Sequence, residues 1–195
     1  MKTLIVTGSP KREGHCFELT RIALDAALKA GAEAEVLRVH DYKLQPCHMC
    51  RDGWGPCREE HVCSFGADGL NEIQAKIAGA DNYVFITPVY WWETSDAMKL
   101  FLDRVRRCEA SKNFSEDKSV KSAFAGKPCI MVASAGGSGN GVIGAMEQMD
   151  RFMRHVGGMF YDHISMNRWT FDYKKNVVAE AVTAMITKGG GGYRA

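Results

Sequence analysis

Four of the seven cysteines lie in one short stretch, residues 46–63, which reads PCHMCRDGWGPCREEHVC. They are Cys47, Cys50, Cys57 and Cys63, with His48 and His61 among them. Four thiolates are the ligand set of many zinc ions and iron-sulfur clusters, and the spacing alone does not distinguish the two. The stretch is therefore a candidate metal or redox site, in which zinc could recruit a histidine. A reduced loop that holds nothing is the remaining alternative.

Three further segments carry residues that suit a bound ligand. The first, GSPKREGHC at residues 8–16, is a glycine turn ahead of a helical pattern. Backbone N–H groups at a helix start bind phosphate, and the side chains of Ser9, Lys11, Arg12 and His15 add hydrogen bonds and charge. No Gly-Lys-Ser/Thr follows at the Walker spacing, so this is not a P-loop. An ordinary strand-to-helix turn is the alternative.

The second segment, PVYWWETSD at residues 88–96, places Tyr90, Trp91 and Trp92 in a row after an apolar run. Three consecutive aromatic side chains cannot all point into a core, and they form a natural platform for a planar ring system. Packing against a partner subunit is the alternative.

The third segment, SAGGSGNG at residues 134–141, runs into a G-x-G-x-x-G pattern at residues 139–144. With Asp162 further on, that pattern makes a dinucleotide fold an alternative. Residues 135–138 separate the pattern from its strand, however, and too little chain follows to complete such a sheet.

These segments need a scaffold, which the hydrophobic pattern supplies. Apolar runs typical of strands alternate with residues spaced as on one face of a helix. We expect strands near residues 2–7, 33–39, 81–87, 128–133 and 159–165, and helices near residues 19–30, 70–77, 98–105, 142–156 and 177–186. Such alternation predicts a parallel α/β sheet covered on both faces, with ligands outside the carboxyl ends of its strands.

Composition limits the remaining possibilities. With 195 residues and 46% hydrophobic composition, the chain suits a single domain, which we expect over residues 1–188 with a flexible tail at 189–195. The apolar run at the N-terminus is too short for a signal peptide or a membrane span, so we expect a cytoplasmic protein. Clustered cysteines in a reducing compartment favour metal or redox chemistry over disulfides. A scattered net charge of +2 predicts no nucleic-acid partner and no membrane partner.

Three stretches together resemble a known family. They are GSPK at residues 8–11 with Gly14, Asp81 with TPVYWWETSDAMKLFLDR at residues 87–104, and SAGGSGNG ahead of a helix. They resemble the flavodoxin-like NAD(P)H-dependent FMN reductase family, and the cysteine stretch ahead of Asp68 resembles its iron-sulfur flavoprotein branch. The resemblance implies a flavodoxin-like three-layer sandwich with a five-stranded parallel sheet that binds FMN.

The resemblance also implies which residues hold the cofactors. The FMN phosphate would be surrounded by Ser9, Lys11, Arg12, His15 and Cys16. The ribityl chain and rings would lie along Pro88, Val89, Tyr90, Trp91 and Trp92. The pyrimidine edge would meet Ala135, Gly136, Gly137, Ser138 and Asn140. A [4Fe-4S] cluster would be held by Cys47, Cys50, Cys57 and Cys63.

The chain departs from the family pattern at both sites. His15-Cys16 stands where the family usually has Asn-Thr, which removes an amide and a hydroxyl from the phosphate site. In the cysteine stretch, Gly53 stands where the family spacing C-x2-C-x2-C-x4-7-C expects the third ligand, and Cys57 follows four residues later. Cys16 itself is either a reactive thiol at a helix start or a small buried group.

The function we expect is FMN-dependent oxidation and reduction. Electrons would pass between NAD(P)H or a reduced carrier protein, FMN and a [4Fe-4S] cluster, in a homodimer or homotetramer. A cluster-free NAD(P)H:FMN, quinone or nitro reductase is one alternative, and a non-enzymatic metal- or thiol-based redox sensor is another. Outside these sites, we expect Cys108 and Cys129 to pack in the core, and Asp103 and Arg104 to cap a helix or form ion pairs.

Overall fold

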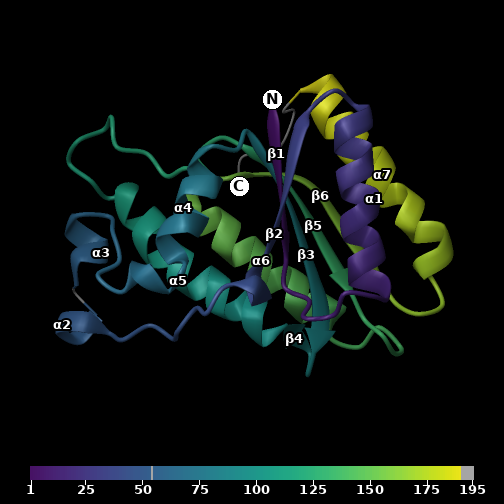
Figure 1. Ribbon diagram of the computed structural model, residues 1–195, viewed down its shortest axis with the longest axis horizontal. Helices are drawn as coiled ribbons and strands as arrows, with labels where there is room; N and C mark the ends of the chain where they lie inside the picture. The colour runs from purple at the N-terminus through teal and green to yellow at the C-terminus, as the bar shows by residue number, and fades with distance from the viewer. Residues whose placement is uncertain (54, 190–195) are drawn as a thin grey trace.

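The structure is a computed structural model that describes residues 1–53 and 55–189. Five parallel strands form its central sheet, in the order β2-β1-β3-β5-β6 (Figure 1). Their bounds are Lys2–Thr7 for β1, Glu33–Arg38 for β2, Asn82–Tyr90 for β3, Pro128–Ser134 for β5 and Met159–Met166 for β6. The order reverses between β1 and β3, as in flavodoxin-like sheets, and this switch point is where such sheets bind ligands.

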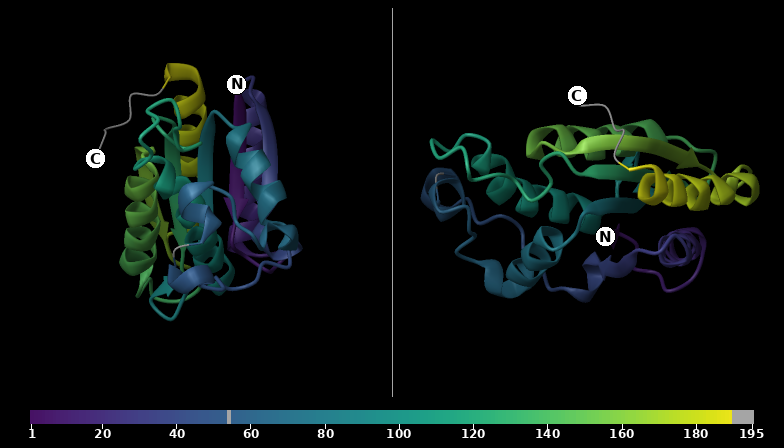
Figure 2. Two further views of the ribbon diagram at one scale, coloured as in Figure 1. Left: turned by 90° about the vertical axis from the view of Figure 1, so that its left-hand side faces the viewer. Right: turned by 90° about the horizontal axis from the view of Figure 1, so that it is seen from above.

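Two layers of helices cover the sheet (Figure 2). On one face lie α1 (His15–Lys29) and α7 (Phe171–Lys188), and on the other lie α4 (Leu70–Ala78), α5 (Asp96–Lys112) and α6 (Val142–Val156). Alternation along the strands explains this division, because successive side chains point to opposite faces. Leu4 and Val6 pack with α4, α5 and α6, whereas Ile5 packs with α1 and α7. The predicted three-layer sandwich is confirmed.

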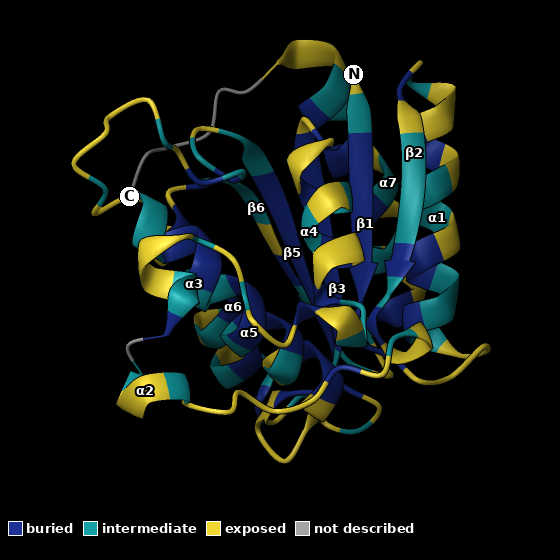
Figure 3. Cartoon of the chain, turned by 60° about the vertical axis from the view of Figure 1, so that its left-hand side comes forward, coloured by how far each residue is buried: buried dark blue, intermediate teal, exposed yellow. Residues whose placement is uncertain are grey.

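The centre of the sheet is buried, as Figure 3 shows by the dark blue of β1, β3 and β5. Residues 82–87 of β3 are all buried. Phe85 contacts Phe101 of α5, Phe152 of α6 and Phe124 from the turn before β5, at ring distances of 5.8, 5.9 and 6.3 Å. A strand buried on both sides needs this continuous apolar sequence, so the run at residues 81–87 was a reliable strand signal.

Several boundaries differ from the prediction. The third strand continues through Pro88 to Tyr90, because its end pairs with a two-residue antiparallel strand, β4 (Glu93–Thr94). The last helix begins at Phe171, six residues earlier than expected. The cysteine stretch, expected as a loop, contains two short helical turns, α2 (Cys50–Gly53) and α3 (Pro56–Glu59), and the 3-10 turn η2 (Gly66–Asp68) follows it.

Within the described residues, no helix is long and apolar enough to cross a membrane. Of the predicted tail at residues 189–195, only Gly189 lies among the described residues.

Candidate functional site

A cavity of about 250 Å³ lies at the carboxyl ends of β3 and β5. It brings together the second and third predicted segments, since its lining consists of Val89, Trp91, Trp92 and residues 135–140. Pro88 and Tyr90 lie in β3 beside it, although they do not line it.

Ser95 holds Gly8, the first residue of the first segment, against the start of α5. Its hydroxyl donates to the carbonyl of Gly8 at 2.7 Å and caps α5 by accepting from the N–H of Met98 at 3.2 Å. Its own N–H donates to Thr87 at 3.1 Å. A Cβ at Gly8 would lie 2.7 Å from both Ser95 Oγ and Met98 Cβ, so only glycine fits there. We did not identify Ser95 from the sequence, although a serine before a helical pattern is the usual sign of an N-cap.

The start of α1 suits an anion. Gly14 is the N-cap, with φ of +80°, and offers no side chain to the first turn, whose N–H groups remain available to a ligand. Ser9 is buried and accepts from the N–H of Lys11 at 3.3 Å, while His15 stacks on Phe171 with ring centres 3.8 Å apart.

Cys16 is buried behind the start of α1, and this burial raises the pKa of its thiol to about 12. A thiol that stays protonated at neutral pH is a poor nucleophile. Cys16 is therefore the small buried group of the two alternatives, and not a reactive thiol.

Two arginines lie beside this first loop. The exposed Arg12 forms an ion pair with Asp41 at 3.1 Å. Arg38, which the sequence did not single out, donates to the carbonyl of Lys11 at 3.2 Å, and its buried Nε has no hydrogen-bond partner. Both arginines thus pair with Asp41, Arg38 at 3.7 Å, and Arg38 in addition holds the backbone of the loop.

The aromatic platform is a strained hairpin turn. Trp91 and Trp92 form its two central residues, with φ of +45° and +70°. A two-residue turn with positive φ at both positions normally takes Asn-Gly, so two tryptophans here are strained. The turn leaves Trp91 94% exposed. Strain that the surrounding fold maintains is typical of ligand sites.

The same turn explains the G-x-G-x-x-G pattern. A Cβ at Gly141 would fall onto Cα of Trp92, and a Cβ at Gly144 would fall onto its carbonyl oxygen. Two of the three glycines therefore allow α6 to pack against the aromatic hairpin. The dinucleotide-fold alternative is wrong, because the sheet has the flavodoxin order and the glycines serve packing.

The third segment presents bare backbone to the cavity. Within 4 Å of a Cβ built at Gly136 or Gly137 there is no other atom. Two residues that follow β6 hold this loop by hydrogen bonds. Asn167 donates to the carbonyl of Ser138 at 3.0 Å, and Arg168 donates to the carbonyl of Gly136 at 3.1 Å. An aromatic turn, open glycine backbone and an uncapped helix start are the features that a flat ring with a phosphate tail requires, so these residues fit FMN.

A second, smaller cavity lies toward the other end of α5. It has about 30 Å³ of free space, and we call it the cysteine cavity. Its lining contains five thiols, all of them free: Cys47, Cys50, Cys57, Cys63 and Cys108. The donor set thus fits a soft metal group in kind and number. Among the described residues, however, no three Cys, His, Asp or Glu side chains are grouped closely enough to hold a metal ion as they stand.

The backbone of the cysteine stretch is unusual. Met49, Arg51 and Asp52 have φ of +47°, +50° and +54°, in the left-handed region that non-glycine residues rarely adopt. The carbonyl of Gly53 accepts a hydrogen bond from Arg107. A Cβ at Gly53 would lie 3.4 Å from Nη2 of Arg107. The guanidinium of Arg107 therefore lies beside the position where the family spacing expects a third cysteine.

Arg104 ties the two ends of the cysteine stretch to α5. It is 3% exposed, forms an ion pair with Asp68 at 2.7 Å and donates to the carbonyl of Gln45. It also donates to the carbonyl of Phe65 at 3.2 Å and to Sγ of Cys63 at 3.4 Å. Although burial acts in the opposite direction, hydrogen bonds from Arg104 hold the pKa of Asp68 below its usual value. Asp103 pairs with Lys99, so the prediction that Asp103 and Arg104 form ion pairs is confirmed.

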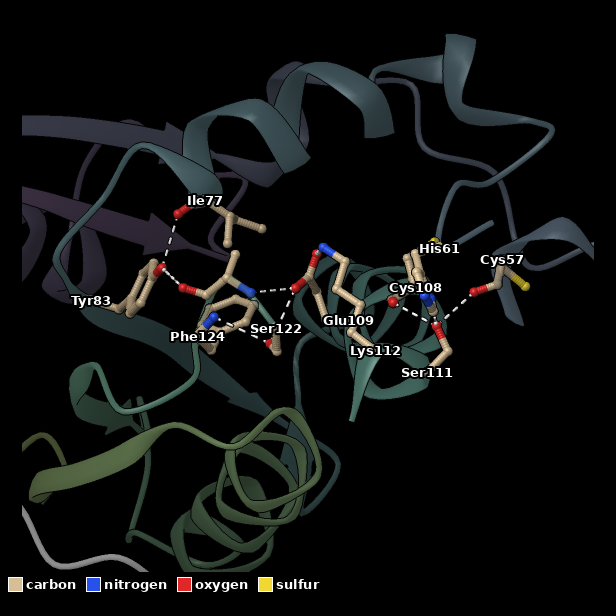
Figure 4. Close-up of polar contacts among 11 residues, drawn as sticks. Cys57, His61, Ile77, Tyr83, Cys108, Glu109, Ser111, Lys112, Ser122 and Phe124 are labelled. Atoms are coloured by element: carbon tan, nitrogen blue, oxygen red, sulfur yellow. Dashed lines mark hydrogen bonds and ion pairs between the residues drawn. The ribbon is translucent and has the colours of Figure 1, made fainter. Parts of the chain in front are cut away.

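Ser111 connects α3 to α5, as Figure 4 shows. Its hydroxyl lies 2.8 Å from the carbonyl of Cys57 and 2.7 Å from that of Cys108, and 2.8 Å from Nδ1 of His61. Because its one proton is shared by the two carbonyls, the oxygen accepts from His61. Burial, with the neighbouring thiols of Cys57 and Cys63, raises the pKa of Cys108 to about 12. Nothing in the sequence pattern pointed to Ser111.

Comparison with known proteins agrees with this geometry. Residues 1–190 match the family described as NADPH-dependent FMN reductase. The chain is 36% identical over 106 residues to an iron-sulfur flavoprotein of Methanocaldococcus jannaschii, covering 54% of this chain and 52% of that protein. It therefore spans about half the length of that relative.

A longer match is to an iron-sulfur flavoprotein of Methanosarcina thermophila, which is 29% identical over 162 residues, 82% of this chain and 75% of that protein. The crystal structure of an NADH:FMN oxidoreductase in its apo form has a TM-score of 0.67 at 17% identity, covering 97% of this chain and 90% of that one. This last likeness shows the shared fold. The chain belongs to the NADPH-dependent FMN reductase family.

Proposed function

We propose that the protein is an FMN-dependent oxidoreductase with NAD(P)H or a reduced carrier protein as its electron donor. The observation that carries the proposal is the cavity at the switch point, with an aromatic hairpin on one side and bare glycine backbone on the other. When bound, FMN supplies hydride transfer and single-electron transfer. A protein or a small molecule would accept the electrons.

The chain's own residues would bind and orient the cofactor. The first turn of α1, with Ser9, Lys11 and His15, would bind the phosphate. Tyr90, Trp91 and Trp92 would contact the rings from one side, and residues 135–138 with Asn140 would approach the pyrimidine edge. Arg12 would reach the phosphate only by leaving Asp41.

Titration of the flavin-free protein with FMN and with riboflavin tests this proposal. We expect FMN to bind more tightly because riboflavin lacks the phosphate, and Lys11→Gln should weaken FMN about 10-fold, as for a lost charge-assisted hydrogen bond. Lys29→Gln, at the exposed far end of α1, is the matched control and should bind normally. A protein that binds neither flavin would contradict the proposal.

The cysteine cavity is proposed to hold a thiolate-bound metal centre. The names of the two archaeal relatives support a [4Fe-4S] cluster on Cys47, Cys50, Cys57 and Cys63, the set that the family pattern implies. A second candidate is a single zinc ion, because four thiolates are also the usual ligand set of a structural zinc site.

Metal and sulfide analysis of anaerobically purified protein separates these candidates. About four iron and four sulfide per chain would support the cluster, and one zinc without sulfide would support the ion. Flavin without any metal would leave the cluster-free reductase.

We also propose a homodimer or homotetramer. Trp91 and Trp92, which line the cavity at the carboxyl ends of β3 and β5 (the flavin cavity), are exposed. Three further large apolar side chains, Ile143, Trp169 and Tyr173, are exposed as well, and exposed apolar groups are candidates for an interface. Within one chain, the start of α5 at Asp96, near the flavin cavity, and Cys108 in the cysteine cavity are twelve residues apart, about 18 Å at 1.5 Å per residue. Assembly could place the cysteine stretch of one subunit near a neighbour's flavin.

Light scattering on Ile143→Glu, with Leu28→Glu as the control, tests whether the protein is an oligomer: only Ile143→Glu should dissociate it.

A further inference from the structure

Cys108 is buried in a different place from the other cysteine that we expected in the core. Cys129 belongs to the hydrophobic cluster between the sheet and α4, α5 and α6. Cys108 is equally inaccessible, at 0% exposure, yet it belongs to neither hydrophobic cluster of the described residues. It lines the cysteine cavity instead. The prediction of burial was right for both residues, but core packing does not account for Cys108.

The turn of α5 that carries Cys108 is fixed from two sides (Figure 4). On one side, Ser111 binds the carbonyls of Cys57 and Cys108 together. On the other, the buried Glu109 accepts from the N–H of Ala123 at 2.7 Å and pairs with Lys112 at 2.8 Å. Cys108 is therefore held facing Cys57 and Cys63 by a regular helix, whereas the segment opposite it is irregular.

Cys47 is the least enclosed of the five thiols. It is exposed, and it also lines an outer groove that reaches toward Phe114 and His155. Cys50, Cys57, Cys63 and Cys108 line the inner cavity and are absent from that groove. A tetrahedral centre takes four thiolates, so five candidates contain one too many. All five thiols line the cavity, but Cys47 alone is exposed and reaches the outer groove, whereas the other four are half-buried or buried.

The absence of a cysteine at residue 53, where the family spacing expects the third ligand, supports setting Cys47 apart from the other four thiols. Gly53 offers no ligand, and the guanidinium of Arg107 lies beside the place that its side chain would occupy. Because residue 53 has no thiol, the cysteine stretch cannot supply its ligands at the family spacing. A thiol from the neighbouring turn of α5 completes an enclosed set without moving Cys47 inward.

We propose that Cys108 is a thiolate ligand of the metal centre in the cysteine cavity, together with Cys50, Cys57 and Cys63, and that Cys47 is not. The ligand chemistry is shared by a cluster and by a single soft ion. This inference rests on the proposed metal centre and changes its ligand set.

The test uses full-length protein, purified and kept without oxygen, in the variants Cys108→Ser, Cys108→Ala and Cys47→Ser. Native iron and zinc are measured first, and Cd²⁺ alone is then titrated into metal-free protein through its sulfur-to-metal absorption. Both Cys108 variants should lose the native metal and bind Cd²⁺ more than about 10-fold more weakly, since even outer partners of metal ligands contribute 10–100-fold. Cys47→Ser should retain both properties.

Cys129→Ser is the matched control, because it alters a buried thiol outside the cavity. Circular dichroism melting and FMN content show whether each variant is folded. Retention of metal and Cd²⁺ affinity by the Cys108 variants, loss of both by Cys47→Ser, or a wild type that binds no Cd²⁺ would overturn the inference. The proposed flavin function fails separately, by absence of FMN from the wild type. Iron with sulfide, or zinc alone, identifies which centre the ligands hold.

Discussion

The flavin cavity and the cysteine cavity lie at opposite ends of α5 and are built differently. The first is formed by loops at the carboxyl ends of parallel strands, so regular elements determine its position. The second is formed by a segment with left-handed residues that three side chains of α5 hold in place: Arg104, Arg107 and Ser111. A site at a switch point follows from the fold, whereas a site in a long connecting segment depends on a few hydrogen bonds and ion pairs to α5. The two ends should therefore respond differently to mutation.

Removing the Arg104 guanidinium should have the largest effect on stability. Arg104→Met removes a buried guanidinium, which leaves the half-buried Asp68 without its ionic partner and the acceptors on Gln45, Cys63 and Phe65 without their donor; we expect a loss of about 3 kcal/mol, the low end for breaking a buried pair. Urea denaturation measures the loss, and FMN titration should show unchanged affinity because the flavin cavity lies at the other end of α5. Arg151→Met breaks an exposed pair with Glu147 and should cost about 0.5 kcal/mol or less. An equally small effect for Arg104→Met would show that the cysteine stretch is held in some other way.

Gly144→Ala tests the opposite end. In a helix interior, alanine normally stabilises by about 1 kcal/mol over glycine. Here its Cβ would fall onto the carbonyl oxygen of Trp92, which is backbone and cannot turn away. We expect a net loss of about 1–3 kcal/mol, typical of overpacking, and weaker FMN binding because the aromatic hairpin shifts. Glu147→Ala, at an exposed position of the same helix, should cost about 0.5 kcal/mol or less and leave FMN binding unchanged. A stabilised Gly144→Ala protein would refute the close packing.

Ser95→Ala probes the connection between the first loop and α5. The variant loses the N-cap of α5 and the hydrogen bond to Gly8, and caps of this kind contribute about 1–2 kcal/mol. FMN affinity should fall together with stability, because the phosphate loop is no longer held beside the cavity. Ser119→Ala, in an exposed loop, is the control. If FMN binding is unchanged in Ser95→Ala, the first loop does not depend on Ser95 for its position.

The sequence predicted the two ends of α5 unequally well, for a physical reason. Strand periodicity and glycine turns are local signals, so the strands and the three loops at their ends could be found without the structure. The ties of the cysteine cavity join residues about 40 to 60 positions apart, as with Gln45, Cys63 and Arg104. No local pattern marks such partners. The strained turn at Trp91 and Trp92 was missed for a similar reason, because its support comes from Gly141 and Gly144 in α6.

Protonation of Asp68 at low pH should destabilise the protein, and this is the smallest of the four expected effects. Hydrogen bonds from Arg104 depress the pKa of Asp68 in the folded state despite burial. A carboxyl group of this kind stabilises the fold above its unfolded pKa of about 3.9, and the contribution is lost as pH falls through the lower folded value. One proton gives a slope of at most about 1.4 kcal/mol per pH unit. Urea denaturation from about pH 5 downward should show a shallower slope for Asp68→Asn than for the wild type, because Glu35, whose pKa is also lowered, still contributes in both proteins. Asp172→Asn, at an exposed carboxylate, should retain the wild-type slope, and an equal slope in Asp68→Asn would assign the acid sensitivity to other groups.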